Sequence, residues 1–201
     1  PVDRRQRQMC IRDRVYGEPV ELPQHEQTTP LNSRVPYAVV KNVGESFFRS
    51  YEKVYGLPYT IFRFFNTYGP NQSMDFVISK FLDAALRGDD ITIYGDGSQT
   101  RTFCYVDDNI NACIKIFEEN HILNDVINIG GAKEYKIIDV AKTIINISGS
   151  SSKIIHLPPL PEGDMTRRMP DNTKMLKILN KELISLEDGI KRMIDHPDFK
   201  M

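Results

Sequence analysis

Residues 36–72 read PYAVVKNVGESFFRSYEKVYGLPYTIFRFFNTYGPNQ, and this stretch decides the fold class. Apolar residues recur every three or four positions along its first half, which predicts a helix over about 36–54 that ends before Gly56. Pro58 then precedes YTIFRFF, whose β-branched and aromatic residues predict a buried strand. The following NTYGP predicts a loop.

Beyond this stretch, helical and strand patterns alternate. Strands are predicted over 91–95, 102–106, 126–130 and 153–157, and helices over 75–87, 107–119, 137–147 and twice within 172–195. Such alternation favours an α/β architecture. The proline-rich polar residues between 19 and 36 predict a long loop before the first helix.

Composition excludes several classes of protein. Of the 201 residues, 40% are hydrophobic and 26% are charged, and the net charge of -1 gives no reason to expect nucleic acid or an anionic membrane as a partner. No apolar run approaches the ~20 residues that span a bilayer. Three cysteines without a CxxC pair and four scattered histidines predict neither a disulfide framework nor a metal site, which suits a reducing cytoplasm.

The first segment, residues 1–14, differs from the rest. PVDRRQRQMCIRDR carries five arginines, and its apolar residues follow neither helical nor strand spacing. A short basic arm for nucleic acid and a transit peptide are alternatives, but a transit peptide would be rich in serine and poor in acidic residues. We interpret the segment as foreign, joined to a truncated chain.

Tyr37 and Lys41 form the first candidate for catalysis. Four residues apart on a helix, they share one face. An ammonium near a phenol lowers the pKa of the phenol, which can then accept a hydroxyl proton near neutral pH. The same spacing is also common on solvated helices, so the pair alone does not establish a site.

Six ordered strings strengthen that reading: VYGEP (15–19), PYAVVKNVGE (36–45), YGLPYTIFRFFNTYGPNQ (55–72), ITIYGDGSQTRTFCYVDD (91–108), VINIGG (126–131) and EGDMTRRMPD (162–171). With them, the chain resembles the NAD-dependent epimerase/dehydratase family of extended short-chain dehydrogenases/reductases, which act on nucleotide sugars. The resemblance covers nearly everything after residue 14. It implies NAD as cofactor, a UDP-sugar as substrate, and a homodimer built from helices such as 36–54.

The resemblance also implies roles for single residues. Tyr37 matches the tyrosine that removes the proton from the sugar 4-hydroxyl, and Lys41 matches the lysine that holds the nicotinamide ribose. The backbone around Phe64 is expected to line the nicotinamide, and the Asn66 side chain is expected to reach the sugar diphosphate. From the sequence alone, Asn66 could equally cap a turn.

Four further positions match substrate-binding residues. Arg101 and Arg168 match two arginines that bind the diphosphate, for which a planar fork of donors is well suited. Either could instead be a surface charge, and the neighbouring Arg167 makes the second assignment less secure. Val77 and Tyr94 match residues that contact the base, although both could be core residues. The acidic pair at 107–108 is most simply a helix cap, not a metal site.

Two features of the family are missing. No GxGxxG turn is present to seat the pyrophosphate of NAD on a helix N-terminus. Where the family has a serine or threonine three residues before VYG, this chain has Arg12. A truncation explains both departures, and it predicts that the chain by itself is inactive; a non-catalytic protein that binds nucleotide sugars is the rival explanation.

The predicted fold is therefore α/β: the end of a doubly wound Rossmann-like sheet with a smaller α/β substrate-binding lobe. Residues 15–70 would end the NAD-binding part, joined by a later strand near 102–106 or 126–129, and 71–201 would mainly form the lobe. The predicted activity passes through a 4-keto sugar. We favour UDP-glucuronate decarboxylation, with UDP-glucose 4-epimerisation and 4,6-dehydration as alternatives.

Overall fold

The structure is a computed structural model that describes residues 16–17, 20–31, 36–119, 122–159 and 167–199, apart from the side chains of Tyr37 and Asp198. The described helices are α1 (Pro36–Tyr55), α2 (Val77–Arg87), α3 (Val106–Glu119), α4 (Ile137–Ser148), α5 (Thr173–Leu179), α6 (Leu186–Asp195) and the 3-10 helix Pro197–Phe199. The described strands are β1 (Thr60–Phe64), β2 (Thr67–Tyr68), β3 (Ile91–Tyr94), β4 (Thr100–Thr102), β5 (Cys104–Tyr105), β6 (Asp125–Ile129), β7 (Glu134–Lys136) and β8 (Ile154–Leu157). The predicted α/β class is confirmed.

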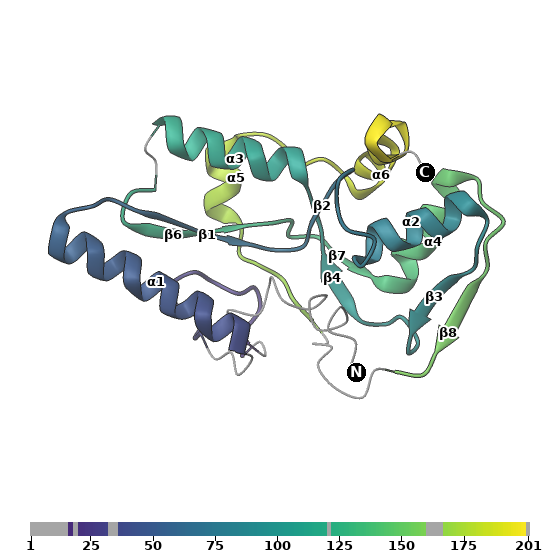
Figure 1. The fold of residues 1–201 in the computed structure, drawn as a ribbon, viewed down its shortest axis with the longest axis horizontal. Helices are drawn as coiled ribbons and strands as arrows, with labels where there is room; N and C mark the ends of the chain where they lie inside the picture. The colour runs from purple at the N-terminus through teal and green to yellow at the C-terminus, as the bar shows by residue number, and fades with distance from the viewer. Residues whose placement is uncertain (1–15, 18–19, 32–35, 120–121, 160–166, 200–201) are drawn as a thin grey trace.

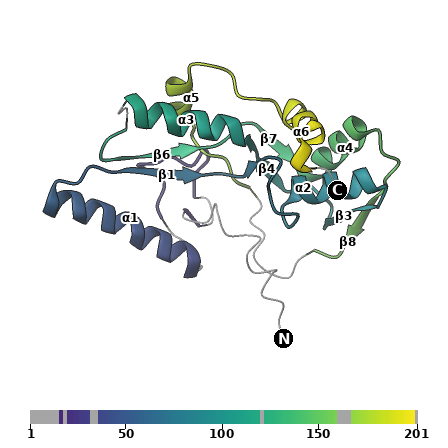
Figure 2. The same ribbon diagram turned by 45° about the horizontal axis from the view of Figure 1, so that its top comes forward.

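One half of the molecule is built on β1 and β6, which pair in parallel from Thr60 opposite Asp125 to Phe64 opposite Ile129. Helix α1 lies on one face of this pair, and α3 and α5 lie on the other (Figures 1 and 2). Helices on both faces are the arrangement expected of a doubly wound sheet. Of the two strands suggested as partners for β1, 126–129 makes this pairing; the division into domains stays a prediction.

The other half is built on the parallel pair β3–β8 and the antiparallel pair β4–β7. In this half, α2 and α4 pack together beside β3, and α6 packs against α4 (Figure 1). Its core is one hydrophobic cluster that includes Leu82, Ile91, Ile144 and Ile190, whereas Ile127, Ile129 and Met175 belong to a second cluster under α3 and α5. The chain crosses between the halves several times.

The prediction of a single strand over 102–106 is wrong in detail. The chain changes partner there: β4 pairs antiparallel with β7, and β5 pairs parallel with β2. Phe103 separates the two strands, and the backbone of Gly131 lies so close to the Phe103 carbonyl that no Cβ would fit. Short strands such as β2 and β7 were not predicted, because two or three residues carry no readable periodicity.

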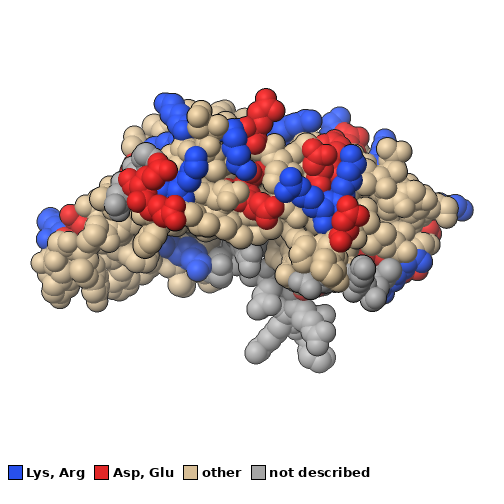
Figure 3. All heavy atoms as spheres, turned by 90° about the horizontal axis from the view of Figure 1, so that it is seen from above, with Lys and Arg blue, Asp and Glu red and all other residues tan. Residues whose placement is uncertain are grey.

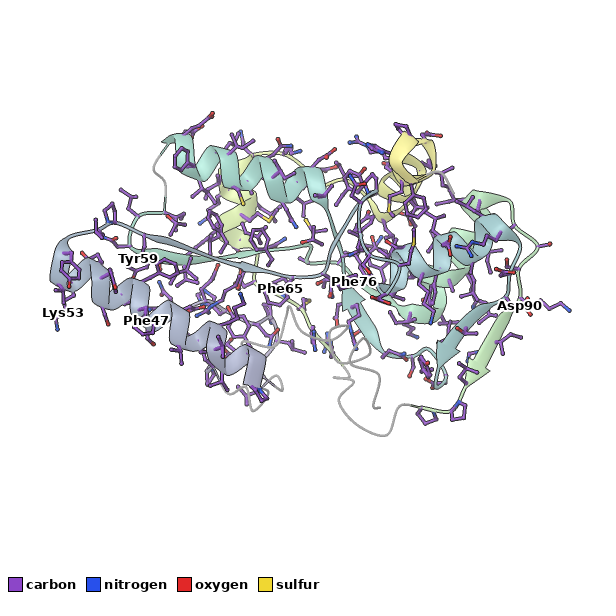
Figure 4. All side chains as sticks on the ribbon, viewed as in Figure 1. Phe47, Lys53, Tyr59, Phe65, Phe76 and Asp90 are labelled. Carbon is purple, nitrogen blue, oxygen red and sulfur yellow. The ribbon has the colours of Figure 1, made fainter. Side chains whose placement is uncertain are left out.

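The strand predicted as buried is exposed along part of one face. In β1, Ile61 and Arg63 are buried, whereas Phe64 is 39% exposed. Figure 4 shows Phe65, the next residue and a buried one, in the middle of the molecule where the two halves meet. The segment 1–14, including Arg12, lies outside the described residues.

Candidate functional site

Helix α1 carries the predicted catalytic pair. Proline is favoured in the first turn of a helix because its missing N–H needs no partner there, and Pro36 begins α1. Tyr37 follows in the same turn, and Lys41 lies one turn further on, at an exposed position. The backbone therefore places the two residues on one face of α1, as predicted. Their catalytic role stays a prediction.

A buried ion pair attaches α1 to β1. Arg63 donates from Nε and Nη2 to the two carboxylate oxygens of Glu45, over 2.8 and 2.7 Å. Its Nη1 donates to the hydroxyl of Tyr16 over 2.8 Å, and that hydroxyl donates to Oδ1 of Asn128 over 2.6 Å. Burial raises the pKa of Tyr16, and the Arg63 charge partly offsets this. The network joins α1, β1, β6 and the segment before α1.

The carboxyl end of β1 holds the two residues predicted to meet the nicotinamide and the sugar. Phe64 ends β1, and the carbonyl of Asn66 accepts a hydrogen bond from the Cys104 N–H over 3.1 Å. The side-chain nitrogen of Asn66 is buried and has no hydrogen-bond partner among the described residues. In open parallel sheets, ligands bind beyond the carboxyl ends of the strands. An unused buried donor at this position fits a polar ligand group.

Val77 and Tyr94 lie in the other half of the molecule. Val77 begins α2 and packs against the larger hydrophobic cluster, which is the core position that the sequence also allowed. Tyr94 ends β3 and is half-buried, with the Lys80 Nζ 5.9 Å from the centre of its ring. The fold thus brings the two predicted base contacts to neighbouring elements, α2 and β3.

The two predicted diphosphate arginines lie on separate segments. Arg101 lies in the middle of β4, opposite Tyr135 of β7, and donates to the Thr100 carbonyl over 2.7 Å. Arg168 is 6% exposed, whereas Arg167 beside it is exposed and forms an ion pair with Glu134 over 2.6 Å. The two adjacent arginines therefore have different surroundings.

The residues after Arg168 are held against the β1–β6 half. The N–H of Gln24 donates to the carbonyl of Met169 over 2.7 Å, and the N–H of Asp171 donates to the carbonyl of Gln24 over 2.8 Å. The side-chain nitrogen of Asn172 donates to the carbonyl of Gly130 over 2.8 Å. The segment that contains Arg168 thus continues directly into a tightly bonded stretch.

The acidic pair at 107–108 attaches α3 to the carboxy-terminal residues. Asp108 is fully buried; its Oδ2 accepts the Ile184 N–H over 2.7 Å, and its Oδ1 pairs with Lys181 over 2.7 Å. Asp107 pairs with Arg192 over 3.1 Å. The cap stays a prediction, and the structure adds that both carboxylates attach the carboxy-terminal residues to α3.

The described residues contain no group of three or more His, Cys, Asp or Glu side chains that could hold a metal ion. Burial raises the pKa of the Cys104 thiol to about 12, so this cysteine is protonated at neutral pH. Basic and acidic side chains are interspersed on the face shown in Figure 3, without a patch of a single sign. None of the described helices has the length and apolar character needed to cross a membrane.

Sequence reasoning did not single out Glu45, Arg63, Asn128 or Glu134. Each makes its contacts with residues distant in the sequence, such as Glu45 with Arg63 and Glu134 with Arg167. No spacing rule connects residues that far apart. The polar or charged character of these side chains was the only available signal, and it does not specify a partner.

Comparison with known proteins identifies the family. A model of the NAD dependent epimerase/dehydratase family matches residues 13–130, more than half of the chain. The chain belongs to this family. UDP-N-acetyl-alpha-D-glucosaminuronate decarboxylase of Bacillus cytotoxicus is 38% identical over 191 residues, which cover 90% of this chain and 56% of the relative. UDP-glucuronic acid decarboxylase 3 of Arabidopsis thaliana is 34% identical over 93% of this chain and 55% of the relative.

Solved structures of the family have the same fold. UDP-glucose 4-epimerase of Thermotoga maritima, solved with UDP-glucose, has a TM-score of 0.84 and 31% identity, over 92% of this chain and 60% of that one. UDP-glucuronic acid 4-epimerase of Bacillus cereus, in complex with UDP-glucuronic acid and NAD, has a TM-score of 0.80 and 32% identity, over 92% and 59%. The chain thus spans a little over half the length of these relatives, and the cofactor of the family is NAD.

Proposed function

We propose that this chain is part of an enzyme that oxidises a nucleotide sugar at C4 with NAD and acts on the resulting 4-keto sugar. The observation that carries the proposal is the carboxyl end of β1, where the buried side-chain nitrogen of Asn66 lacks a partner among the described residues. Together with family membership, this unused donor supports a polar ligand at the position where parallel sheets bind theirs.

Residues of this chain suit one end of NAD. Lys41 would hold the nicotinamide ribose, and the backbone around Phe64 would line the nicotinamide. No GxGxxG turn occurs in the 201 residues, so the pyrophosphate would need residues that this sequence does not contain. We therefore propose that the 201 residues alone show no NAD-dependent turnover.

Tyr37 would act as the base. NAD, when bound, accepts the hydride from C4 of the sugar. The phenolate oxygen of Tyr37 would take the proton of the 4-hydroxyl, and the Lys41 ammonium would favour that phenolate. Asn66, Arg101 and Arg168 would bind the diphosphate, and Val77 and Tyr94 would contact the base of the nucleotide.

The favoured reaction is decarboxylation of UDP-glucuronate. The two curated relatives named above are decarboxylases, and both solved structures named above are 4-epimerases. UDP-glucose 4-epimerisation is therefore the second candidate, and 4,6-dehydration the third. A non-catalytic protein that binds a nucleotide sugar is the alternative of another class, and the retained Tyr37 and Lys41 favour an enzyme over it.

The test uses the full-length protein that contains this chain. It is incubated with NAD+ and either UDP-glucuronate or UDP-glucose, and products are followed by NMR. A UDP-pentose with release of carbon dioxide supports decarboxylation, and a C4 epimer supports epimerisation. Tyr37→Phe should lower the rate by about 10²–10⁴-fold, as expected for loss of a general base. Sugar-nucleotide binding without turnover would establish the non-catalytic alternative.

We also propose that the full-length protein is a homodimer that associates through α1. Several large apolar side chains of α1 are more than half exposed, among them Val40, Phe47, Tyr51 and Val54. An apolar surface of this kind marks an interaction site in soluble proteins.

A further inference from the structure

Glu134 joins three segments that are distant in the sequence. It begins β7, and its carboxylate accepts three hydrogen bonds from Arg167: from Nε over 2.8 and 3.0 Å and from Nη2 over 2.6 Å. One of its oxygens, Oε1, also accepts the hydroxyl of Thr100 over 2.8 Å. A single carboxylate thus connects β7, β4 and the segment that begins at Arg167.

Both partners of this carboxylate immediately precede a predicted diphosphate ligand. Thr100 precedes Arg101 in β4, and Arg167 precedes Arg168. On its far side, the segment with Arg168 is fixed by the hydrogen bonds between Gln24 and Met169 and between Asp171 and Gln24. Glu134 is therefore placed to set the distance between the two arginines.

We propose that Glu134 is a positioning residue for diphosphate recognition, which fixes Arg101 and Arg168 at the separation that a nucleoside diphosphate requires. The proposal rests on the proposed function, which assigns the diphosphate to these two arginines. Arginine side chains have much rotamer freedom, and holding their segments in place before binding lowers the entropy lost on binding.

The negative charge of Glu134 distinguishes positioning from a direct electrostatic effect on the ligand. The hydrogen bonds from Arg167 hold the pKa of this carboxyl below its ordinary value, so it is an anion at neutral pH. An anion close to a diphosphate site repels the ligand through space. Coulomb repulsion alone therefore predicts tighter UDP binding when the charge is removed, whereas positioning predicts weaker binding. The two explanations differ in sign.

The experiment titrates the full-length protein that contains this chain with UDP and, separately, with uridine by calorimetry. Glu134→Gln should weaken UDP binding about tenfold, which is within the range measured for residues of one ion-pair network. Uridine lacks phosphates, so the affinity of the variant for uridine should stay within about twofold of that of the unsubstituted protein. The ratio of the two affinity changes separates positioning of the two phosphate-binding arginines from general damage to the lobe.

Asp83→Asn is a matched control. Asp83 pairs with Arg87 over 2.7 Å, with side chains 17% and 53% exposed, against 2.6 Å, 18% and 52% for Glu134 and Arg167. Both members of this pair lie in α2, an element separate from those of Arg101 and Arg168, so its loss should leave UDP binding unchanged.

The positioning role is overturned if Glu134→Gln binds UDP as tightly as the unsubstituted protein or more tightly. It is also overturned if the affinities for UDP and for uridine fall by the same factor. Two further variants, Arg101→Gln and Arg168→Gln, distinguish failure of the positioning role from failure of the proposed function. If both variants keep the original UDP affinity, or if the full-length protein binds neither ligand, the diphosphate assignment itself falls, and the positioning role falls with it.

Discussion

The guanidinium of Arg63 lies against the carboxylate of Glu45 with two hydrogen bonds of 2.8 and 2.7 Å, and the side chains of both residues are at least nine-tenths buried. The pair joins β1 to the helix that carries Tyr37 and Lys41. Removing one partner of a buried ion pair is costly, because the other charge remains without compensation in a poorly solvating environment.

Arg63→Met should therefore lower the free energy of unfolding by about 3–5 kcal/mol. Arg63→Met combined with Glu45→Leu should recover part of this loss, because no buried charge is left unpaired. Urea unfolding followed by circular dichroism measures both. Arg87→Met, which breaks the exposed pair with Asp83, serves as the control and should cost about 0.3–0.5 kcal/mol. A cost for Arg63→Met no larger than the control would contradict the argument.

The pH dependence of stability should report on Glu134. Its carboxyl pKa is lowered from 4.5 chiefly by the Arg167 hydrogen bonds; burial opposes this in part, and the Thr100 hydroxyl lowers the pKa further. A lowered pKa in the folded state stabilises the fold fully above 4.5, and this contribution disappears as the pH falls through the folded-state value. Arg167→Gln should thus reduce the loss of stability between about pH 5 and pH 3. Urea midpoints across this range measure the effect, and an NMR titration in which the Glu134 pKa does not rise in the variant would refute it.

Self-association should depend on the exposed face of α1. Phe47→Asp combined with Tyr51→Asp should shift the chain towards monomer in sedimentation velocity, because charges replace apolar side chains that are 60% and 51% exposed. Phe117→Asp is the control: Phe117 is 84% exposed but lies on α3. Equal effects of the two changes would indicate non-specific association instead of an α1 interface.

Substitution by alanine should change the free energy of unfolding in opposite directions at two glycines. A Cβ on Gly131 would collide with the carbonyl of Phe103, a backbone atom that cannot move without disturbing β4 and β5. Gly44 lies within α1, and a Cβ there meets nothing within 4 Å. Gly44→Ala should raise the free energy of unfolding by about 0.5–1 kcal/mol, since alanine has the higher helix propensity. Gly131→Ala should lower it by more than this gain. Thermal unfolding of the two variants tests the pair, and a stable Gly131→Ala protein would disprove the close packing.

Several elements could be predicted because their signals are local. The helix over 36–54, the strand after Pro58 and the helix over 137–147 each follow from residues within one short window, and the structure has them at Pro36–Tyr55, Thr60–Phe64 and Ile137–Ser148. Hydrophobic periodicity reports which face of one element is buried, and neighbouring residues suffice for that. The family was also predicted correctly, from ordered strings of sequence.

The contacts between elements could not be predicted. The sequence left 102–106 and 126–129 as alternatives for the strand beside β1, and only the structure shows that β6 makes this pairing. Nothing in the sequence indicates that the chain changes partners at Phe103 or that Glu134 contacts Arg167. These contacts depend on how the chain is folded back on itself, and the residue types alone are compatible with many partners.

The sequence by itself determined the α/β class, the family and the candidate residues Tyr37 and Lys41, because these depend on residue types at fixed spacing. Only the tertiary structure decided how α1 is attached to β1 and which residues join the segments of Arg101 and Arg168. The physical reason is that a charged side chain specifies the chemistry of its partner but not its position, and the position is set by packing of the whole chain.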